Sequence, residues 1–460
     1  MHVMDAASRD AGAPRRNATL GAVGPLPLPP APRNLIETGL PQAFLVDLTL
    51  KMLAQRGSLS LQDLAWQIHL PRGVLGPVVD FVRNERLAEI GRGGMPELDA
   101  QYQLTDKGHA RAVEAARRCS YTGPAPVPLE LYQAIVTAQA VSNERFEAID
   151  VRHALADVVL DPELVDRIGA AMNSGRAMLL YGPPGSGKTY IAELLARLAR
   201  GSIAVPYALF VGGEIVQVYD PIFHEAIEQA GPIGLLERTH DRRWQVCRRP
   251  MIVSGGELTL AMLDLQFDEQ TRFYQAPPHM KANGGIYVVD DLGRQLVSPR
   301  DLMNRWIVPL DRRRDYLSLH NGFKFSVPFE MTVVFSTNLQ PAQLADEAFL
   351  RRFGYKILVG PVDPGSYRTL FERVCDELGV RFDAQGLEWL LRERHHRTGR
   401  ALLACYPRDL IGRVRDLAVY QREPAEMSEE SLARAWSVYF IHEQCGEGEL
   451  EVGGVGTVPV

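Results

Sequence analysis

The chain has 460 residues, enough for two or three domains, and 46% hydrophobic and 23% charged residues are ordinary values for a globular protein. A net charge of −6 gives no global reason to expect nucleic-acid or membrane binding. The five cysteines form no C-x-x-C pair, which argues against a disulfide framework and a zinc site. We find no signal peptide and no apolar run that could span a bilayer, so we expect a cytoplasmic protein without membrane insertion.

The two ends of the chain are predicted to lack regular secondary structure. Residues 1–37 are rich in Ala, Pro and Gly, and they include the run Pro25–Pro30. This composition predicts a disordered lead, with a partner-binding polyproline segment as an alternative. Residues 446–460 are rich in Gly and Glu and are predicted to be a flexible tail.

Residues 38–120 are predicted to form the first folded unit. The apolar spacing and the capping residues Ser60 and Thr105 predict helices over 43–55, 61–69, 71–84 and 106–118, and strands over 87–90 and 102–104. This order resembles a winged-helix domain, and YQLTDKGHARA is similar to the end of such wings. The resemblance implies either a DNA-binding or a protein-docking module.

The residues of this unit favour protein docking over DNA binding. Its third helix would enter the major groove of DNA, but it offers only Arg72 and Arg83 as cations, alongside Asp80. Acids and bases are nearly balanced across the unit, so the basic surface of a DNA-binding protein is missing. Residues 121–156 follow as a linker, with a stiff connector at 123–128 and a predicted helix over 129–148.

A phosphate-binding loop follows a helix that is predicted from Asp161 to Gly175. An apolar run at 177–181 leads into GPPGSGKT, which matches G-x-x-x-x-G-K-[ST]. The glycines let the backbone curl around a phosphate, the lysine reaches the β- and γ-phosphates, and the threonine ligates Mg²⁺. The predicted ATP-binding residues are Gly182, Pro183, Pro184, Gly185, Ser186, Gly187, Lys188 and Thr189.

Two later apolar runs are predicted to be buried parallel strands with polar ends. The run 285–289 ends in Asp290 and Asp291, as a Walker B strand does. We expect Asp290 to hold Mg²⁺ and Asp291 to orient or deprotonate the attacking water. The run 331–337 ends in Asn338, which could hydrogen-bond that water or the γ-phosphate. Arg351 and Arg352 follow, where the nucleotide of a neighbouring subunit could reach them.

This order of motifs resembles an AAA+ ATPase over about residues 158–443. FLRRFGYKI is similar to the arginine-finger segment of Clp-type unfoldases, and FYQAPPHMKANGGIYVVDD is similar to enhancer-binding and MoxR-like members. The resemblance implies that Asn338 is the sensor-1 residue and that Arg351 and Arg352 include the arginine finger. It also implies that Arg408 is the sensor-2 arginine.

We therefore predict an α/β fold: an AAA+ P-loop parallel sheet at 157–360, a four-helix lid at 361–445 and the winged-helix-like domain in front. Two departures from the family stand out. Most members carry Glu where this chain has Asp291, so hydrolysis could be slow. The long gap before Asp290 predicts an insertion within 203–256. Its basic stretch 242–250 is interpreted as a solvated hairpin, with a pore, partner or nucleic-acid contact as alternatives.

The resulting hypothesis is an ATP hydrolase that binds ATP and Mg²⁺ and assembles as a homo-oligomeric ring, a hexamer in the first instance. It would remodel a protein substrate or adaptor that the winged-helix-like module recruits. Two alternatives stay open: a DNA-associated ATPase that uses this module on nucleic acid, and a nucleotide switch that hydrolyses ATP slowly.

Overall fold

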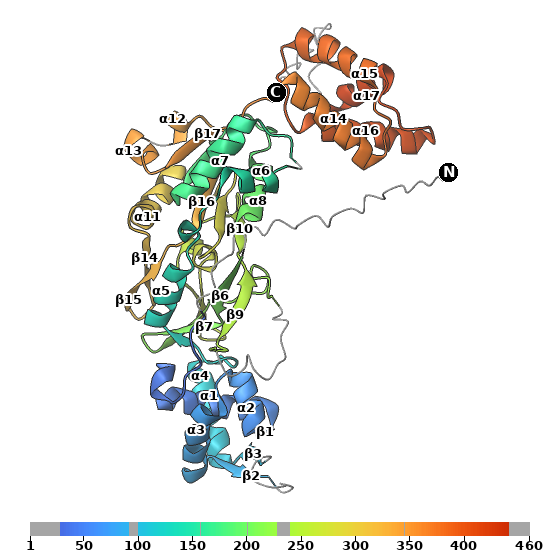
Figure 1. Cartoon of the computed structure of the whole chain (residues 1–460). Coiled ribbons are helices and arrows are strands. Elements are labelled where there is room, and N and C mark those ends of the chain that lie inside the picture. Colours follow the sequence, from blue (N-terminus) through green and yellow to red (C-terminus); the bar gives the residue numbers. More distant parts are fainter. Residues whose placement is uncertain are drawn as a thin grey trace, which may run out of the picture.

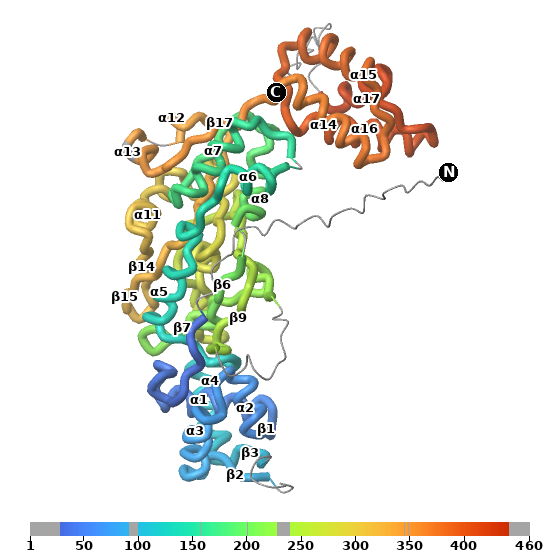
Figure 2. The backbone as a smooth tube through the Cα atoms, viewed as in Figure 1, coloured from blue at the N-terminus to red at the C-terminus, as the bar shows by residue number. Residues whose placement is uncertain are grey.

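The computed structural model describes residues 28–91, 100–156, 158–199, 201–227, 240–344 and 346–440. The molecule is elongated, with the N-terminal unit at one end and helices α14 to α17 at the other (Figure 1). A β-rich region and then a parallel sheet lie between them, and the tube in Figure 2 shows the path of the chain through these parts. Among the described residues, no helix is both long and apolar enough to cross a membrane. The predicted tail at 446–460 lies outside the described residues.

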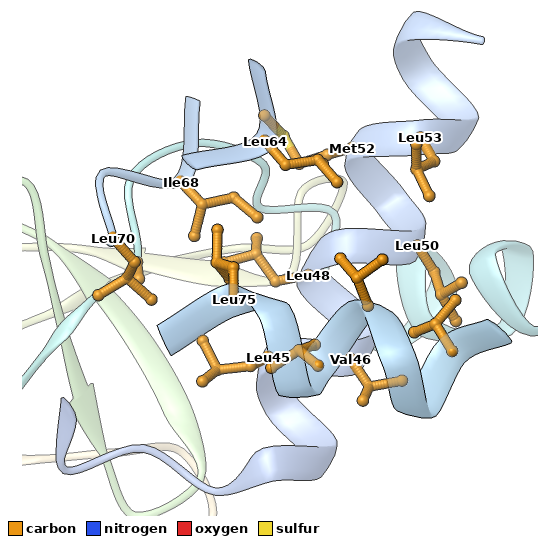
Figure 3. Packing of buried hydrophobic residues seen from close by; sticks show 14 of the residues in the cluster. Leu45, Val46, Leu48, Leu50, Met52, Leu53, Leu64, Ile68, Leu70 and Leu75 are labelled. Carbon is orange, nitrogen blue, oxygen red and sulfur yellow. The ribbon is translucent and has the colours of Figure 1, made fainter. Parts of the chain in front are cut away.

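The N-terminal unit packs four α-helices and a small sheet around one core. Its elements are η1 (Ile36–Thr38), α1 (Gln42–Arg56), β1 (Ser58–Ser60), α2 (Leu61–Ile68), α3 (Arg72–Asn84), β2 (Ala88–Ile90), β3 (Gln101–Leu104) and α4 (Asp106–Arg118), and the antiparallel strands take the order β1-β3-β2. Leucines of α1 meet Leu64, Ile68 and Leu75 of α2 and α3 (Figure 3). Ser60 and Thr105 cap α2 and α4 as predicted.

The expectation of a disordered lead up to residue 37 is wrong from Leu28 onward. Leu28 packs against the core of the β-rich region, and Pro29 is buried. The Pro29 carbonyl accepts a hydrogen bond of 2.8 Å from the Asp241 amide. This part of the proline-rich run is therefore bound within the chain itself.

The linker contributes to the β-rich region. It contains β4 (Val127–Pro128), α5 (Leu129–Ala138), η3 (Val141–Asn143) and α6 (Ala148–Ala154), so the prediction of one helix over 129–148 is wrong. Helix α5 ends before Gln139, whose buried side chain exchanges two hydrogen bonds of 2.9 Å with the backbone of Ala204. These bonds hold the chain against β6 and turn it away from the helix axis.

The β-rich region is larger than the predicted insertion and does not coincide with it. It contains β6 (Ser202–Pro206), β7 (Ala208–Val211), β8 (Glu214–Gln217), β9 (Trp244–Arg248), η4 (Ala261–Leu263), β11 (Gln266–Asp268), β12 (Phe273–Gln275), α10 (Pro278–Lys281), β14 (Arg314–Ser318) and β15 (Lys324–Pro328). One sheet has the order β11-β12-β8-β7-β4, while β6-β9 and β14-β15 form antiparallel pairs. Residues 258–281 and the pair β14-β15 therefore extend this region well beyond 256.

The basic stretch 242–250 is not a solvated hairpin, because two of its arginines are buried. Arg243 is 1% exposed and pairs with the equally buried Asp241, with Nη2 2.8 Å from Oδ2. It also donates to the carbonyls of Thr38 and Pro126. Arg249 pairs with Glu144 at 2.6 Å. The stretch thus fastens the N-terminal unit and the linker to the β-rich region.

The nucleotide-binding part is a five-stranded parallel sheet in the order β10-β13-β16-β5-β17. Its elements are α7 (Pro162–Ser174), β5 (Met178–Tyr181), α8 (Lys188–Leu198), β10 (Met251–Ser254), β13 (Ile286–Val289), α11 (Pro299–Arg312), β16 (Thr332–Thr337), α12 (Pro341–Leu344), α13 (Glu347–Leu350) and β17 (Tyr355–Leu358). Apolar cores on both faces bury the strands, as expected for a parallel sheet. Strand β10 lies within the predicted insertion but belongs to this sheet.

Helix α11 leads into the strand pair β14-β15. It ends at Arg312, because Arg313 adopts a left-handed conformation with φ 52° and the chain continues into β14. The last unit packs α14 (Pro364–Leu378), α15 (Ala384–Trp389), the π-helix η5 (Leu390–His396), α16 (Tyr406–Gln421) and α17 (Glu429–Tyr439) around its own core. The four predicted lid helices are present, and η5 continues α15.

Candidate functional site

The phosphate-binding loop joins β5 to α8 at the carboxyl edge of the parallel sheet. Gly182, Gly185 and Gly187 have φ values of 151°, 81° and 92°. Residues that carry a side chain adopt such values only with backbone strain. A Cβ atom on Gly182 would lie 2.2 Å from the Val359 carbonyl oxygen. The loop therefore needs glycine both for its curvature and for its packing against the end of β17.

Lys188 begins α8 and is 5% exposed. Its ammonium group donates to the carbonyls of Gly182 (3.1 Å) and Pro183 (2.8 Å) and to Asn338 Oδ1 (2.7 Å). Burial lowers the pKa of Lys188, and the carboxylates of Asp291 and Asp290 oppose that shift. The cation is thus held between the loop and the end of β16.

Thr189 and Asp290 meet across the sheet edge. The Thr189 hydroxyl donates to the Asp290 carboxylate, at 2.9 Å to Oδ2 and 3.2 Å to Oδ1. A hydroxyl beside a carboxylate is the type of oxygen donor set that Mg²⁺ prefers. The two residues that the motifs predict for the metal are therefore neighbours, and their chemistry fits that ion.

Asp291 and Asn338 form a second pair beside the first. Asn338 Nδ2 donates to Asp291 Oδ1 at 3.1 Å. Asp291 has φ 50°, a conformation that Asp and Asn tolerate better than most residues. Because Asn338 accepts from Lys188 through its other amide atom, the loop, β13 and β16 contribute to one hydrogen-bonded chain.

These groups open into a cleft of about 720 Å³ between the sheet and the lid. The lining residues include the loop from Pro184 onward, the segment 158–160, and Leu370, Val374 and Arg408 of the lid. The lid touches the loop directly, because the Cys405 amide donates to the Gly185 carbonyl at 3.1 Å. Arg408 lines the cleft as expected, but its guanidinium pairs with Glu377 at 2.6 Å.

Arg351 and Arg352 lie away from this cleft. They line a second pocket, of about 570 Å³, at the opposite edge of the sheet, together with Arg176, Arg312 and Arg313. Arg352 Nε lies 3.1 Å from Asp311 Oδ2, and the exposed Arg351 pairs with Glu347 at 3.2 Å. Neither arginine can be assigned to the nucleotide site of its own chain.

The sequence did not indicate several residues that line the cleft, and Arg294 and Cys405 are among them. Arg294 lies only three positions after Asp291, and this closeness to the predicted strand end is the signal that could have indicated it. Cys405 comes from the lid, and no local pattern places a lid residue on the phosphate loop. The geometry also accommodates phosphate, because the Ser186 hydroxyl is buried and has no hydrogen-bond partner among the described residues.

Family comparisons agree with this geometry. The model of the ATPase family associated with various cellular activities (AAA) matches residues 178–230, which begin at β5. A model described only as a domain of unknown function, DUF8689, matches residues 363–438, the helical unit after β17.

The similarity to curated proteins is local. The chain is 40% identical over 73 residues to an ATP-dependent zinc metalloprotease FtsH of Corynebacterium glutamicum, covering 16% of this chain and 8% of that protein. It is 26% identical over 186 residues to a proteasome-activating nucleotidase of Methanoculleus marisnigri, covering 37% and 43%. The chain thus spans less than half the length of these relatives.

Solved structures resemble the chain more distantly. A variant of the Thermotoga maritima RuvB protein aligns with a TM-score of 0.34 at 13% identity, covering 65% of this chain and 72% of its own. The FIGL-1 AAA domain in complex with ADP aligns with a TM-score of 0.30 at 16% identity, covering 63% and 77%.

Proposed function

We propose that this protein, an AAA+ ATPase, couples ATP hydrolysis to the remodelling of a protein partner. One observation carries the enzymatic part of the proposal. Lys188, the Thr189–Asp290 pair and the Asn338–Asp291 pair converge at one sheet edge beside a cleft of about 720 Å³. A phosphate-binding loop, a metal-binding pair and a carboxylate that can act on water are the components that phosphoryl transfer needs.

The residues divide the work of hydrolysis as follows. The loop amides and Lys188 bind the phosphates, and Thr189 with Asp290 would hold Mg²⁺, which neutralises phosphate charge when bound. Asp291 orients a water toward the γ-phosphorus and accepts its proton, while the bond from that phosphorus to the ADP oxygen breaks. Asn338 fixes the Asp291 carboxylate through their 3.1 Å hydrogen bond. Arg408 would reach bound nucleotide from the lid after leaving Glu377.

The position of Arg351 and Arg352 supports the proposal of a ring assembly. Both lie at the sheet edge opposite their own phosphate loop, so they can act on ATP only in a neighbouring subunit. An arginine supplied in this way stabilises charge on the transferring phosphoryl group. We propose a homo-oligomeric ring, with a hexamer as the expected form, working in the cytoplasm.

The partner is proposed to be a protein. Two of the relatives, an ATP-dependent zinc metalloprotease and a proteasome-activating nucleotidase, are named for ATP-driven work on proteins, which supports a protein partner. Arg243 joins the N-terminal unit to the β-rich region through its hydrogen bonds. A conformational change in the β-rich region would therefore be transmitted to a partner bound to the N-terminal unit. DNA remains a second candidate ligand, but the exposed Arg83 on α3 lies 3.9 Å from Asp80 and is offset by it.

A slowly hydrolysing switch is a further candidate, because Asp291 is one methylene shorter than the glutamate common in the family. The experiment that separates motor from switch is the steady-state ATPase rate of the full chain against protein concentration. A ring motor predicts a rate per subunit that rises with concentration and vanishes in Asp291→Asn. A flat, near-zero rate with tight ATP binding would favour the switch.

The ring proposal has its own test. Arg351→Ala and Arg352→Ala chains are mixed separately with a Lys188→Ala chain, which retains both arginines but has a disabled loop. Recovery of ATPase activity with one of the two variants identifies the finger. Without recovery in either mixture, the trans assignment fails. For the DNA alternative, the full chain is titrated with duplex DNA at low and high salt, and absence of binding at low salt removes it.

A further inference from the structure

The loop after β13 brings a further cation to the nucleotide cleft. Arg294 lines the cleft together with the phosphate loop, Asp291 and Asn338. These residues come from the ends of neighbouring strands in a single chain, so the cleft places Arg294 beside the phosphate loop of its own subunit. This distinguishes it from Arg351 and Arg352, which line the opposite edge.

The backbone of this loop is firmly fixed. The Arg294 amide donates to the Asp291 carbonyl at 2.9 Å, and the Leu292 amide donates to the Ser336 carbonyl at 2.7 Å. The Gln295 side chain donates to the Asp290 carbonyl at 2.6 Å and accepts from the Gly293 amide at 2.8 Å. Arg294 therefore lies in a tight turn that is hydrogen-bonded to the ends of both β13 and β16.

The Arg294 guanidinium differs from Lys188 and Arg408 of the same cleft. It makes no hydrogen bond, ion pair or ring contact with any residue that the structure describes, and the residue is exposed. Lys188 is held by loop carbonyls and Asn338, and Arg408 is paired with Glu377. Arg294 is thus available to an anion in the cleft without first breaking an ion pair.

We propose that Arg294 binds the γ-phosphate of the nucleotide held by its own chain and stabilises the charge that develops there during hydrolysis. This inference rests on the proposed ATPase function and adds a catalytic residue to it. A guanidinium offers several donors in one plane, which suits the oxygens of a phosphoryl group. The position one turn after Asp291 places this charge near the attacking water as well as the phosphate.

The test compares Arg294→Ala and Arg294→Lys with Arg300→Ala, an exposed arginine of α11 that does not line the cleft. We expect Arg294→Ala to lower kcat about 10²-fold to 10³-fold, because a positioned charge is lost. It should weaken ATP binding about tenfold and leave ADP binding unchanged. Arg294→Lys should recover part of kcat, and Arg300→Ala should match the unmodified chain.

Mixing separates action in cis from action in trans. When Arg294→Ala is mixed with Lys188→Ala, a cis residue predicts no recovery, because no active site then has both groups. Recovery of activity would overturn the assignment, as would an equal loss of ATP and ADP affinity or an unchanged kcat. If the unmodified protein does not hydrolyse ATP, the proposed function fails, but the difference between ATP and ADP binding still decides whether Arg294 binds the γ-phosphate.

Discussion

Asn338 links the phosphate loop to Asp291 through the two ends of one amide group. Its nitrogen donates to Asp291 Oδ1 at 3.1 Å, and its oxygen accepts from Lys188 Nζ at 2.7 Å. The residue therefore couples the lysine that we propose binds phosphate to the carboxylate that we propose acts on water. A carboxylate held in this way has its orientation set by the end of β16.

Removing this amide should affect catalysis more than binding. We expect Asn338→Ala to lower kcat about 10-fold to 100-fold, because Asp291 loses the hydrogen bond that orients it. The Kd for ATP should change less than about threefold, since Lys188 keeps its loop contacts. Single-turnover and binding measurements separate the two effects. Gln340→Ala, an exposed polar position just beyond β16, is the matched control. A large loss of ATP affinity with unchanged kcat would contradict the proposed role.

The buried Arg243 of the β-rich region should matter far more for stability than its half-buried neighbour Arg242. Arg243→Ala leaves Asp241 buried without its partner, which is expected to cost about 3–5 kcal/mol. Arg242→Ala removes only a cation–π contact 4.2 Å above Trp66, worth about 0.5–1 kcal/mol. Urea unfolding measures the loss of stability in each variant, and hydrogen exchange of α1 to α4 shows whether the N-terminal unit is affected.

A double change tests whether the penalty comes from the unpaired charge. Asp241→Leu combined with Arg243→Met removes both charges, and it should be more stable than Arg243→Ala alone. If Arg243→Ala and Arg242→Ala were equally mild, the pair would not fasten the N-terminal unit.

Two helix glycines of the N-terminal unit should respond in opposite directions to alanine. A Cβ on Gly108 would lie 1.8 Å from the Leu87 carbonyl oxygen, so Gly108→Ala should destabilise the unit by about 2–3 kcal/mol. A Cβ on Gly73 of α3 meets nothing within 4 Å, so Gly73→Ala should stabilise α3 by about 0.5–1 kcal/mol. Shifts of the urea midpoint in opposite directions are the expected result. Destabilisation by Gly73→Ala would show that α3 is packed differently.

The contact between the N-terminal unit and the β-rich region should weaken in acid. His69 Nδ1 lies 2.7 Å from the Arg242 carbonyl oxygen, so the ring donates there, and burial lowers the pKa of His69 to about 4. Between pH 6.5 and 4 the unfolded chain therefore binds a proton that the folded chain does not, and stability falls as the pH falls. The expected loss by pH 5 is about 1–2 kcal/mol.

The His69→Asn variant isolates this effect. Asn tolerates the left-handed backbone at this position, φ 59°, and its amide can still donate to the carbonyl, but it does not titrate. The difference in unfolding free energy between pH 7.5 and pH 5 should be smaller in the variant than in the unmodified chain. Equal pH dependence in the two proteins would assign it to other groups.

Several parts of the site could be predicted from sequence because they depend on neighbouring residues. The loop needs glycine at φ values that other residues avoid. The spacing of glycines from Gly182 to Thr189 is therefore enough to identify the loop in the sequence. The apolar strands before Asp290 and Asn338 predict that both side chains emerge at one edge, since parallel strands end together. Helix caps such as Ser60 and Thr105 are equally local, and they are confirmed.

Other features depended on contacts between distant segments, and there local patterns misled. The sequence predicts that the residues of β10 belong to an insertion, but their pairing with β13 places this strand in the parallel sheet. The sequence pattern predicts that Arg243 and Arg249 are solvated, but in the structure both side chains are buried and form ion pairs with Asp241 and Glu144. Burial of a charge depends on which segments meet, and residue spacing along the chain does not encode that.

The sequence by itself determined that this protein has a glycine-rich loop between a strand and a helix, an apolar strand that ends in two aspartates and a helical unit after the sheet, because each is built from consecutive residues whose backbone preferences are local. Only the tertiary structure decided that Asn338 joins Lys188 to Asp291, that Arg294 enters the same cleft, and that Arg351 and Arg352 lie at the opposite edge. Those relationships depend on the order of the strands in the sheet. That order is fixed by packing of the whole core, because every strand must be buried on both faces at once.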